Sequence, residues 1–322
     1  MKWRPLFAVL AVAAIWLAAP IVASAADKQL TIAFQRMVNS WKVAIADRAF
    51  EKATGYAIKW RRFASGLDVV KAMALGEVQL ASMGSTSIAL GVSSGIDIEL
   101  VWILEDIGAG EALVAREGTA SFAPRDLKGK KIGVQLGSTA HFHLLFALEQ
   151  FGYAPGDVEI WGMQPGAIGT RWKGGSIDAA FVADPVLSEI KRSGRELISS
   201  GELSRLGKAA FDGIVVDKTW AKNNPKFMVN FIRTIARADE TYKANRSRWT
   251  PTSEPDDVPR GLFLYRYPDL AEQASEKWLG GGAVSGAARA LYQTSKFLVE
   301  QRLLGTLLVD YGPAVNDGWV KA

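Results

Sequence analysis

The sequence predicts an α/β protein with two lobes, each built on a parallel sheet that helices cover on both faces. Short apolar segments alternate with segments of helical periodicity along most of the chain, and this alternation is typical of such sheets. The 322 residues are enough for two domains of ordinary size. A third observation is a glycine followed by hydroxyl residues, which occurs once in each expected lobe, between an expected strand and an expected helix.

In the first half of the chain, strands and helices are expected in regular alternation. Apolar or alternating segments favour strands, and apolar residues at helical spacing favour helices. Residues 41–53 show the helical spacing, with Ala46, Ala49 and Phe50 on one face. The expected strands are residues 30–34, 58–63, 79–83, 98–104 and 112–115, and the expected helices are residues 41–53 and 67–75.

A second unit begins after Thr119 and continues this order, with a helix expected at residues 139–151. Asn224 and Pro225 then provide a cap and a first position for a long helix. One face of that helix carries Met228, Phe231, Ile232, Ile235, Asp239 and Tyr242. The expected strands are residues 131–135, 158–161, 179–182 and 213–216. We therefore expect one lobe from residues 26–115 and 213–322, and the other from residues 116–212.

Residues 1–25 have the features of a cleaved signal peptide. Two basic residues precede an apolar run at 6–22, and Ala23-Ser24-Ala25 has the small-x-small pattern of a cleavage site. The run is shorter than the roughly 20 residues of a membrane-spanning helix, and Pro20 interrupts it. With no cysteine available for a lipid anchor, we expect cleavage near Ala25 and an untethered product in the periplasm.

Composition argues against several classes of function. The formal net charge of +5 is mild and its basic residues are dispersed, so a nucleic-acid partner is not expected. The absence of cysteine excludes a thiol nucleophile and a thiolate metal site. His141 and His143 lie two positions apart on one expected helix and point to different faces, so they do not jointly hold a metal. We expect neither a cofactor nor a metal, and no enzymatic activity.

The two glycine-hydroxyl motifs, Gly84 to Ser87 and Gly137 to Thr139, indicate an anion site. Each follows an expected strand and opens an expected helix. A helix N-terminus offers free backbone N–H groups and a partial positive charge. The alternative is that these hydroxyls are ordinary helix caps. Because there is one copy in each expected lobe, we favour an anion held between the lobes by residues around Ser85, Thr86, Ser87, Ser138 and Thr139.

Two single acidic residues fall at the same strand-end level. Glu111 precedes the expected strand 112–115, and Asp212 precedes the strand 213–216. Ligands of open α/β sheets bind beyond the carboxyl ends of the strands, so either carboxylate is placed to meet a ligand ammonium. Either is equally placed to cap and solvate the edge of a lobe.

The sequence resembles the taurine-binding proteins of ABC importers, a branch of the wider family of sulfonate, nitrate and thiamine-precursor binding proteins. The resemblance covers nearly all of the expected mature chain, and the order and spacing of its segments carry it. These segments are Ala33-Phe34-Gln35, Trp60 to Gly66, Gly84 to Ala89, Gly110 to Val114, Ser138 to His141, Gln164-Pro165 and Gly175 to Phe181. The resemblance implies a type II periplasmic binding protein fold, with a hinge and a ligand cleft between the lobes.

The resemblance also implies roles for individual residues. Ser85, Thr86, Ser138 and Thr139 would receive a sulfonate, and Glu111 and Asp212 would meet an ammonium. The remaining expected ligand-binding residues are Gln35, Ser87, His141 and Asp184, the last of which is alternatively a helix cap ahead of Pro185. The protein would be a monomer that closes on taurine or a related aminosulfonate and delivers it to an ABC permease in the inner membrane.

Two departures from the family pattern widen the choice of ligand. Ala183 stands where related taurine receptors commonly have an aromatic residue, which leaves room for a bulkier ligand, and Arg36 is unusually large and charged beside the first strand. An alkanesulfonate, nitrate and a thiamine pyrimidine precursor are the ligands that compete with taurine. Two different functions also compete with transport: a sensor that presents its ligand to a chemoreceptor, and an enzyme resembling those of pyrimidine synthesis, which the absence of cysteine disfavours.

Overall fold

A computed structural model describes residues 28–35, 40–118, 123–154, 156–244 and 265–322. The expected signal peptide, residues 1–25, and Arg36 lie outside the described residues. In the part of the chain that is described, no helix has the length and apolar character needed to cross a membrane.

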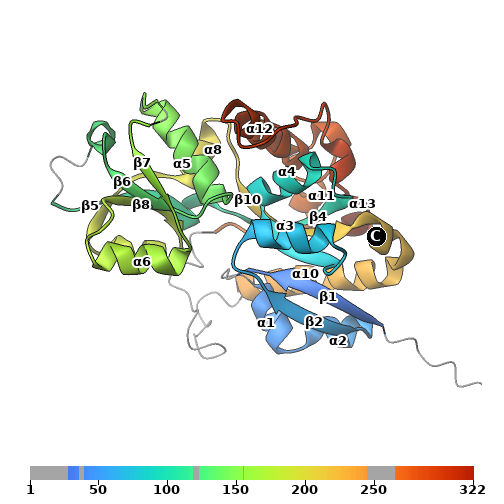
Figure 1. The fold of residues 1–322 in the computed structure, drawn as a ribbon. Helices are drawn as coiled ribbons and strands as arrows, with labels where there is room; N and C mark the ends of the chain where they lie inside the picture. Colours follow the sequence, from blue (N-terminus) through green and yellow to red (C-terminus); the bar gives the residue numbers. More distant parts are fainter. Residues whose placement is uncertain (1–27, 36–39, 119–122, 155, 245–264) are drawn as a thin grey trace, which may run out of the picture.

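Two five-stranded sheets form the centres of two lobes, as predicted (Figure 1). The first lobe has the strand order β2-β1-β3-β10-β4, and the second lobe has the order β7-β6-β8-β5-β9. The strands of the first sheet are β1 (Gln29–Phe34), β2 (Ala57–Arg62), β3 (Leu80–Gly84), β4 (Ile98–Asp106) and β10 (Phe211–Asp217). Those of the second sheet are β5 (Glu111–Arg116), β6 (Lys131–Val134), β7 (Glu159–Gly162), β8 (Ala179–Ala183) and β9 (Gly194–Ser199).

Helices cover both faces of each sheet. In the first lobe, α3 and α4 lie on one side of the sheet, and α1, α2 and α10 lie on the other (Figure 1). The helices of this lobe are α1 (Trp41–Ala46), α2 (Ala49–Thr54), α3 (Gly66–Ala74), α4 (Ser85–Ser93), α9 (Lys218–Asn223), α10 (Pro225–Ala244), α11 (Leu270–Ala274), α12 (Gly286–Glu300) and α13 (Gly318–Lys321). Those of the second lobe are α5 (Thr139–Gln150), α6 (Pro165–Lys173), α7 (Val186–Ile190) and α8 (Ser200–Arg205). Short 3₁₀ turns are η1 (Gly108–Gly110), η2 (Pro124–Leu127), η6 (Gly282–Val284) and η7 (Gly312–Ala314).

The sheets are mixed rather than wholly parallel, which corrects one expectation. Strand β10 is antiparallel to β3 and β4, and β5 is antiparallel to β8 and β9. Both strands follow a crossing from the other lobe. Such a strand enters its sheet from the cleft side, where the neighbouring parallel strands end, and so it must run in the opposite direction.

The lobe boundaries also differ from the predicted ones. Residues 111–115 were expected in the first lobe, but β5 pairs within the second sheet. Asp212 was expected in the second lobe, but it pairs with Gly84 in the first sheet. The crossings therefore lie between 106 and 111 and between 205 and 211, so that Glu111 is the first residue of β5 and Asp212 the second residue of β10.

Two local features differ from the expected elements. The expected helix 41–53 is broken into α1 and α2, because Arg48 takes a left-handed conformation with φ 53°. Strand β9 was not predicted. It is an edge strand whose side chains are mostly half-buried or exposed, so its sequence lacks the apolar pattern on which strand prediction depends.

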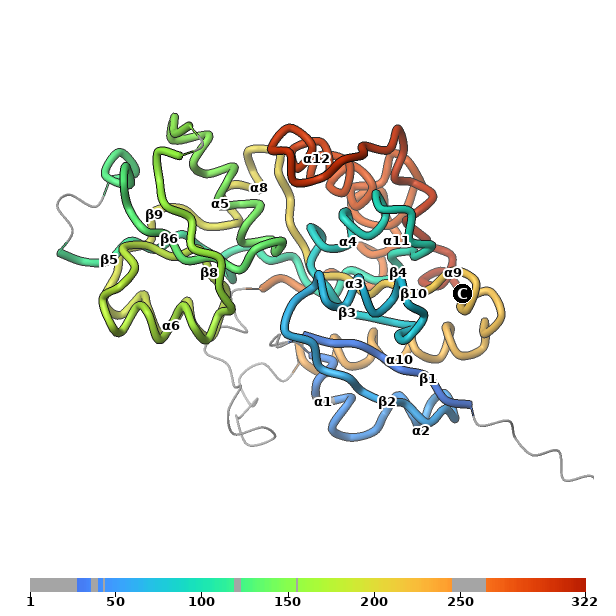
Figure 2. Tube along the Cα trace, viewed as in Figure 1, coloured from blue at the N-terminus to red at the C-terminus, as the bar shows by residue number. Residues whose placement is uncertain are grey.

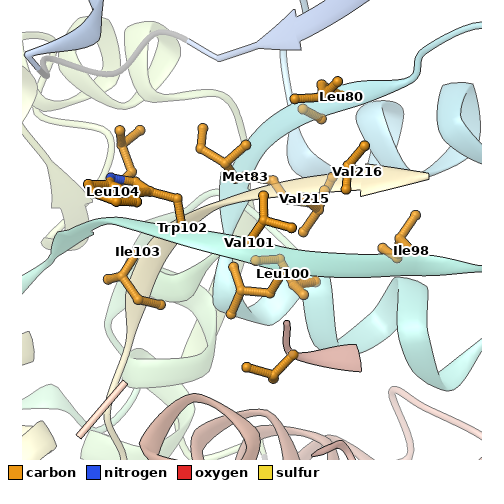
Figure 3. Close-up of a cluster of buried hydrophobic side chains, with 14 of the residues drawn as sticks. Leu80, Met83, Ile98, Leu100, Val101, Trp102, Ile103, Leu104, Val215 and Val216 are labelled. Carbon is orange, nitrogen blue, oxygen red and sulfur yellow. The ribbon is translucent and has the colours of Figure 1, made fainter. Parts of the chain in front are cut away.

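The core of the first lobe is centred on β4, of which every residue but the last is buried. Figure 3 shows apolar side chains of β4, β3 and β10 packed together, with Trp102 and Ile103 on opposite sides of the β4 ribbon. Helix α10 buries the predicted face, from Met228 to Tyr242. These elements hold β3, β4 and β10 side by side, and the cleft ends of those strands are thereby fixed.

In the second lobe, the strand β5 has a core on each face. Leu113 packs in a cluster with side chains of α5, whereas Val114 packs with Ile168 of α6 and with α7. Helix α12 joins the two lobes on the far side of this core. Its Phe297 meets Phe142 of α5 edge-on, with ring centroids 5.5 Å apart, and Figure 2 shows α12 beside α8 and α5.

Candidate ligand-binding cleft

A cavity of about 560 Å³ lies between the lobes at the cleft ends of the strands. Both lobes contribute to its wall. The lining residues are Gln35, Arg62, Phe63, Ala64, Gly66, Gly84, Ser87, Glu105, Asp212 and Tyr265 from the first lobe, and Glu111, Gln135, Ser138, Thr139, Gln164, Pro165, Gly166, Ala183, Asp184, Pro185 and Val186 from the second. Its size and its few convergent polar groups are typical of small-molecule sites.

A larger hollow of about 770 Å³ lies along α12 and η6. Asp106, at the end of β4, is the one strand residue among the described residues of its lining, and most of the others belong to α12 and the segments around it, whereas ligands of open α/β sheets bind beyond several strand ends. Its charged side chains are also engaged elsewhere, since Asp106 pairs with Arg266 and Lys277 pairs with Glu272. We therefore assign the candidate site to the smaller cavity.

The cavity brings together seven of the ten expected ligand-binding residues: Gln35, Ser87, Glu111, Ser138, Thr139, Asp184 and Asp212. Ser85, Thr86 and His141 do not line it. The Ser85 hydroxyl is fully buried and accepts a hydrogen bond from the Phe211 N–H at 3.3 Å. The His141 Nδ1 accepts from the Gly137 N–H at 3.3 Å, so this ring supports the turn before α5.

The starts of α4 and α5 face the same cavity from opposite lobes. Gly84 is the N-cap of α4, and Ser138 is the N-cap of α5. The Ser138 Oγ accepts from the His141 N–H at 3.2 Å, so the capping interpretation holds for this residue. A helix cap and an anion site are compatible here, because one cap bond leaves other first-turn N–H groups without an intrahelical acceptor. Two helix N-termini, each with a partial positive charge, also converge on one cavity.

The hydroxyl protons at this site go to acceptors in the protein. Thr139 Oγ1 donates to Glu111 Oε1 at 2.6 Å, Ser138 Oγ donates to the Gln135 carbonyl at 2.7 Å, and Ser87 Oγ donates to the Gly137 carbonyl at 3.3 Å. A hydroxyl has one proton to donate. These three hydroxyl protons are therefore engaged within the protein. In this arrangement the donors for an anion come instead from backbone N–H groups and from other side chains.

Arg62 supplies the one arginine or lysine side chain of the cavity wall among the described residues. It ends β2, which pairs in parallel with β1, so that Arg62 stands opposite Phe34 and beside Gln35. Its sequence signal was weak, because it is the second of two adjacent arginines in an exposed strand. A guanidinium is well suited to sulfonate or phosphate oxygens because it offers several N–H donors in one plane.

Four carboxyl groups line the cavity, and burial raises the pKa of three of them. The pKa of Glu111 is raised to about 8, mainly by burial and against the Thr139 hydrogen bond. Burial also raises the pKa of Asp212 to about 6. Glu105, which sequence reasoning missed, has its pKa raised well above the ordinary value by burial and then by the Asp212 charge. Glu105 comes directly after the apolar run 100–104, at the end of a strand, whereas Glu111 and Asp212 were singled out ahead of their strands.

Asp184, the fourth carboxyl group, has two different oxygens. Its Oδ1 accepts from the Ser188 N–H at 2.8 Å and so caps α7. Its Oδ2 is buried and has no hydrogen-bond partner. Asp184 therefore performs the capping role, and its second oxygen remains as an acceptor at the cavity wall.

The lobes contact each other across the cavity. Gln135 Nε2 donates to the Ala64 carbonyl at 2.9 Å, and the Ser87 bond to Gly137 also joins the lobes. Gly84 lies so close to the second lobe that an added Cβ would be 2.9 Å from Thr139 Cγ2. This glycine is required by close approach, since any side chain would push the two helix starts apart.

Ala183 lies opposite Glu111 in the β5–β8 pairing and lines the cavity. Aromatic wall is supplied from elsewhere, by Phe63 and by Tyr265. The Tyr265 hydroxyl donates to the Gly110 carbonyl at 3.2 Å. Tyr265 lies 155 residues from Gly110 in the chain, and no local sequence pattern links the two.

Comparisons with known proteins agree with this architecture. A taurine-binding periplasmic protein of Escherichia coli (strain K12) is 32% identical over 304 residues, which cover 91% of this chain and 92% of that protein. The alkanesulfonate-binding protein of Xanthomonas axonopodis pv. citri, solved with MOPS bound, has a TM-score of 0.75 at 24% identity and covers 90% of this chain and 99% of its own. A desulfurization enzyme shares the fold with a TM-score of 0.63 at 15% identity, over 91% of this chain and 98% of its own. Residues 46–246 match the family described as NMT1/THI5 like, and the chain belongs to that family.

Proposed function

We propose that this protein is the periplasmic solute-binding component of an ABC importer, and that it binds taurine or a closely related small aminosulfonate. The observation that carries the proposal is the polarity of one cavity. Two helix starts and Arg62 offer donors to an anion, and buried Glu111 and Asp212 offer acceptors to a cation. The taurine-binding relative, which matches over nine-tenths of both chains, supports the choice of ligand class.

In the proposed complex, the sulfonate lies against the N–H groups at the starts of α4 and α5, with Arg62 and Gln35 as further partners. The ammonium lies between Glu111 and Asp212. An ionised Asp212 left buried without a cation costs about 1–3 kcal/mol, so a zwitterion is favoured over a plain alkanesulfonate or nitrate. The Thr139 hydroxyl, already bound to Glu111, ties the anion-binding helix to the cation-binding carboxylate.

Ligand binding would be coupled to closure of the lobes. The two helix starts come from different lobes, and so the anion is fully coordinated only when the lobes meet. The Gln135 and Ser87 bonds across the cleft favour the same closed arrangement. The closed monomer would then dock on its permease in the inner membrane, after removal of residues 1–25 near Ala25.

A bulkier cationic sulfonate is the second candidate ligand. The cavity of about 560 Å³ is large for a molecule as small as taurine, and Ala183 leaves the wall beside Glu111 open. The Xanthomonas relative was solved with MOPS, a sulfonate with a bulky amine. Such a ligand would be larger than taurine but would carry the same two charges.

A thermal-unfolding panel of taurine, hypotaurine, methanesulfonate, nitrate and an aminopyrimidine tests the proposal. A ligand at about 100 times its dissociation constant stabilises the fold by about 2.7 kcal/mol. We expect taurine or a larger aminosulfonate to give the largest shift, and Glu111→Gln to reduce it. A largest shift from nitrate or methanesulfonate, neither of which has a cation, would overturn the assignment of Glu111 and Asp212.

A further inference from the structure

Glu105 and Asp212 lie directly opposite each other on neighbouring strands, at the cleft ends of β4 and β10. Like charges in this position repel, which destabilises the sheet. The pairing is irregular between Asp212 and Gly213, where β10 shifts against β4. Irregularities of this kind re-aim a side chain, and here both carboxyl groups line the same cavity and are close enough to shift each other's pKa.

A hydrogen bond between two carboxyl groups needs one proton between them, because an ionised carboxylate can only accept. Burial decides which group holds it. Glu105 is 1% exposed and Asp212 is 8% exposed, so a charge is less costly on Asp212. Glu105 therefore holds the proton and donates it to an ionised Asp212.

The groups around Glu105 leave a charge on it uncompensated. Burial raises the pKa of Glu105, and the nearby Tyr267 phenol lowers it by less. The other titratable groups that act on it are Asp212 and, from α10, the buried Asp239, while Glu105 itself acts on the nearby Tyr265 hydroxyl. These neighbours include two carboxyl groups and two phenols but no lysine or arginine, so nothing in this set compensates a charge on Glu105.

We propose that Glu105 is a positioning residue of the cation subsite: its protonated carboxyl group orients Asp212 and keeps it ionised for the ligand's ammonium. This inference rests on the proposed function, in which Asp212 meets that ammonium. It adds a residue of the cavity wall whose part in binding the ammonium is exerted through Asp212. The arrangement also explains why two buried carboxyl groups are tolerated side by side, since the pair carries one negative charge.

Two variants of Glu105 separate this role from a merely structural one. In Glu105→Gln, the side-chain amide still donates to Asp212, whereas Glu105→Leu fills a similar volume without a donor. The affinities for taurine and for ethanesulfonate, which has no ammonium, are measured by isothermal titration calorimetry. Thermal unfolding of the ligand-free variants reports on folding.

We expect Glu105→Leu to lower the preference for taurine over ethanesulfonate by about tenfold, because a charge-assisted hydrogen bond to Asp212 is lost. We expect Glu105→Gln to recover most of that preference. Equal losses for both ligands would show a structural role only. A Glu105→Gln variant as defective as Glu105→Leu would show that Glu105 acts as an anion, and either result would overturn the proposal.

An infrared measurement tests the protonation state without any ligand. The spectrum of the wild-type protein at neutral pH should contain a carbonyl band of a protonated carboxyl group that is missing from Glu105→Gln. Absence of that difference would refute the proposal even if no aminosulfonate binds. Failure of taurine to bind the wild-type protein, with the band present, would instead refute the proposed function and leave the protonated pair in place.

Discussion

The pH dependence of ligand binding follows from the buried Glu111 carboxyl group. Its pKa in the ligand-free protein is about 8, because burial disfavours the charged form. At about pH 7 roughly one molecule in ten is ionised at this position, and ionising the rest costs about 1.4 kcal/mol. An ammonium bound beside Glu111 needs the ionised form. Binding therefore draws a proton from Glu111, and affinity should rise with pH.

The expected magnitude is about a tenfold gain in taurine affinity between about pH 7 and a plateau above about pH 8, with a further loss of nearly tenfold at about pH 6. The ligand's aliphatic ammonium stays charged over this range. Titration calorimetry at neutral pH in buffers of different ionisation enthalpy should show release of nearly one proton per taurine. The control is Glu111→Gln, which should bind more weakly and with a much flatter pH profile.

Two results would refute this reasoning. One is a taurine affinity that stays constant across the range from about pH 6 to about pH 8. The other is a binding enthalpy that does not depend on the buffer. Either would mean that Glu111 is already ionised in the free protein or that the ligand's cation lies elsewhere.

Three further predictions concern closure and stability. Gly84→Ala places a Cβ 2.9 Å from Thr139 Cγ2, and such overpacking costs about 1–3 kcal/mol. Calorimetry should therefore show the taurine affinity lowered about tenfold or more, and an unchanged affinity would contradict the tight contact. Phe231→Ala empties part of the first-lobe core and should cost about 3–5 kcal/mol in urea unfolding while taurine affinity is retained. Burial lowers the pKa of His143 to about 4, so the folded state loses stability as the pH falls from about 6.5 towards about 4, by about 3 kcal/mol in full. His143→Gln should remove this part of the pH dependence of the unfolding free energy. An unfolding free energy with the same pH profile in the variant would count against this role.

Much of the fold follows from local sequence pattern. The run 100–104 is apolar on both faces and forms the centre of β4, a strand buried on both sides. The predicted face of residues 225–244 is the buried face of α10. These elements were predictable because burial imposes a period on the sequence. Strand β9 and the break at Arg48 were not, since an edge strand and a single left-handed residue leave that period unchanged.

Strand direction and the shape of the site depend on distant contacts. The antiparallel direction of β5 and β10 results from the crossings between lobes, which no local pattern records. Seven of the expected site residues line the cavity, since strand ends and helix starts are local features that the fold gathers together. The place of Tyr265 in the wall and the hydrogen bond between Thr139 and Glu111 could not be predicted in the same way, because each depends on which distant segments meet in the fold.

The central claim is that the cavity binds a zwitterion in one orientation, and a crystal structure of the protein with taurine tests it most directly. The account predicts that the taurine nitrogen lies within hydrogen-bonding distance of Glu111 and Asp212, and that the sulfonate oxygens lie at the starts of α4 and α5. Taurine bound in the reverse orientation, or bound outside this cavity, would contradict it.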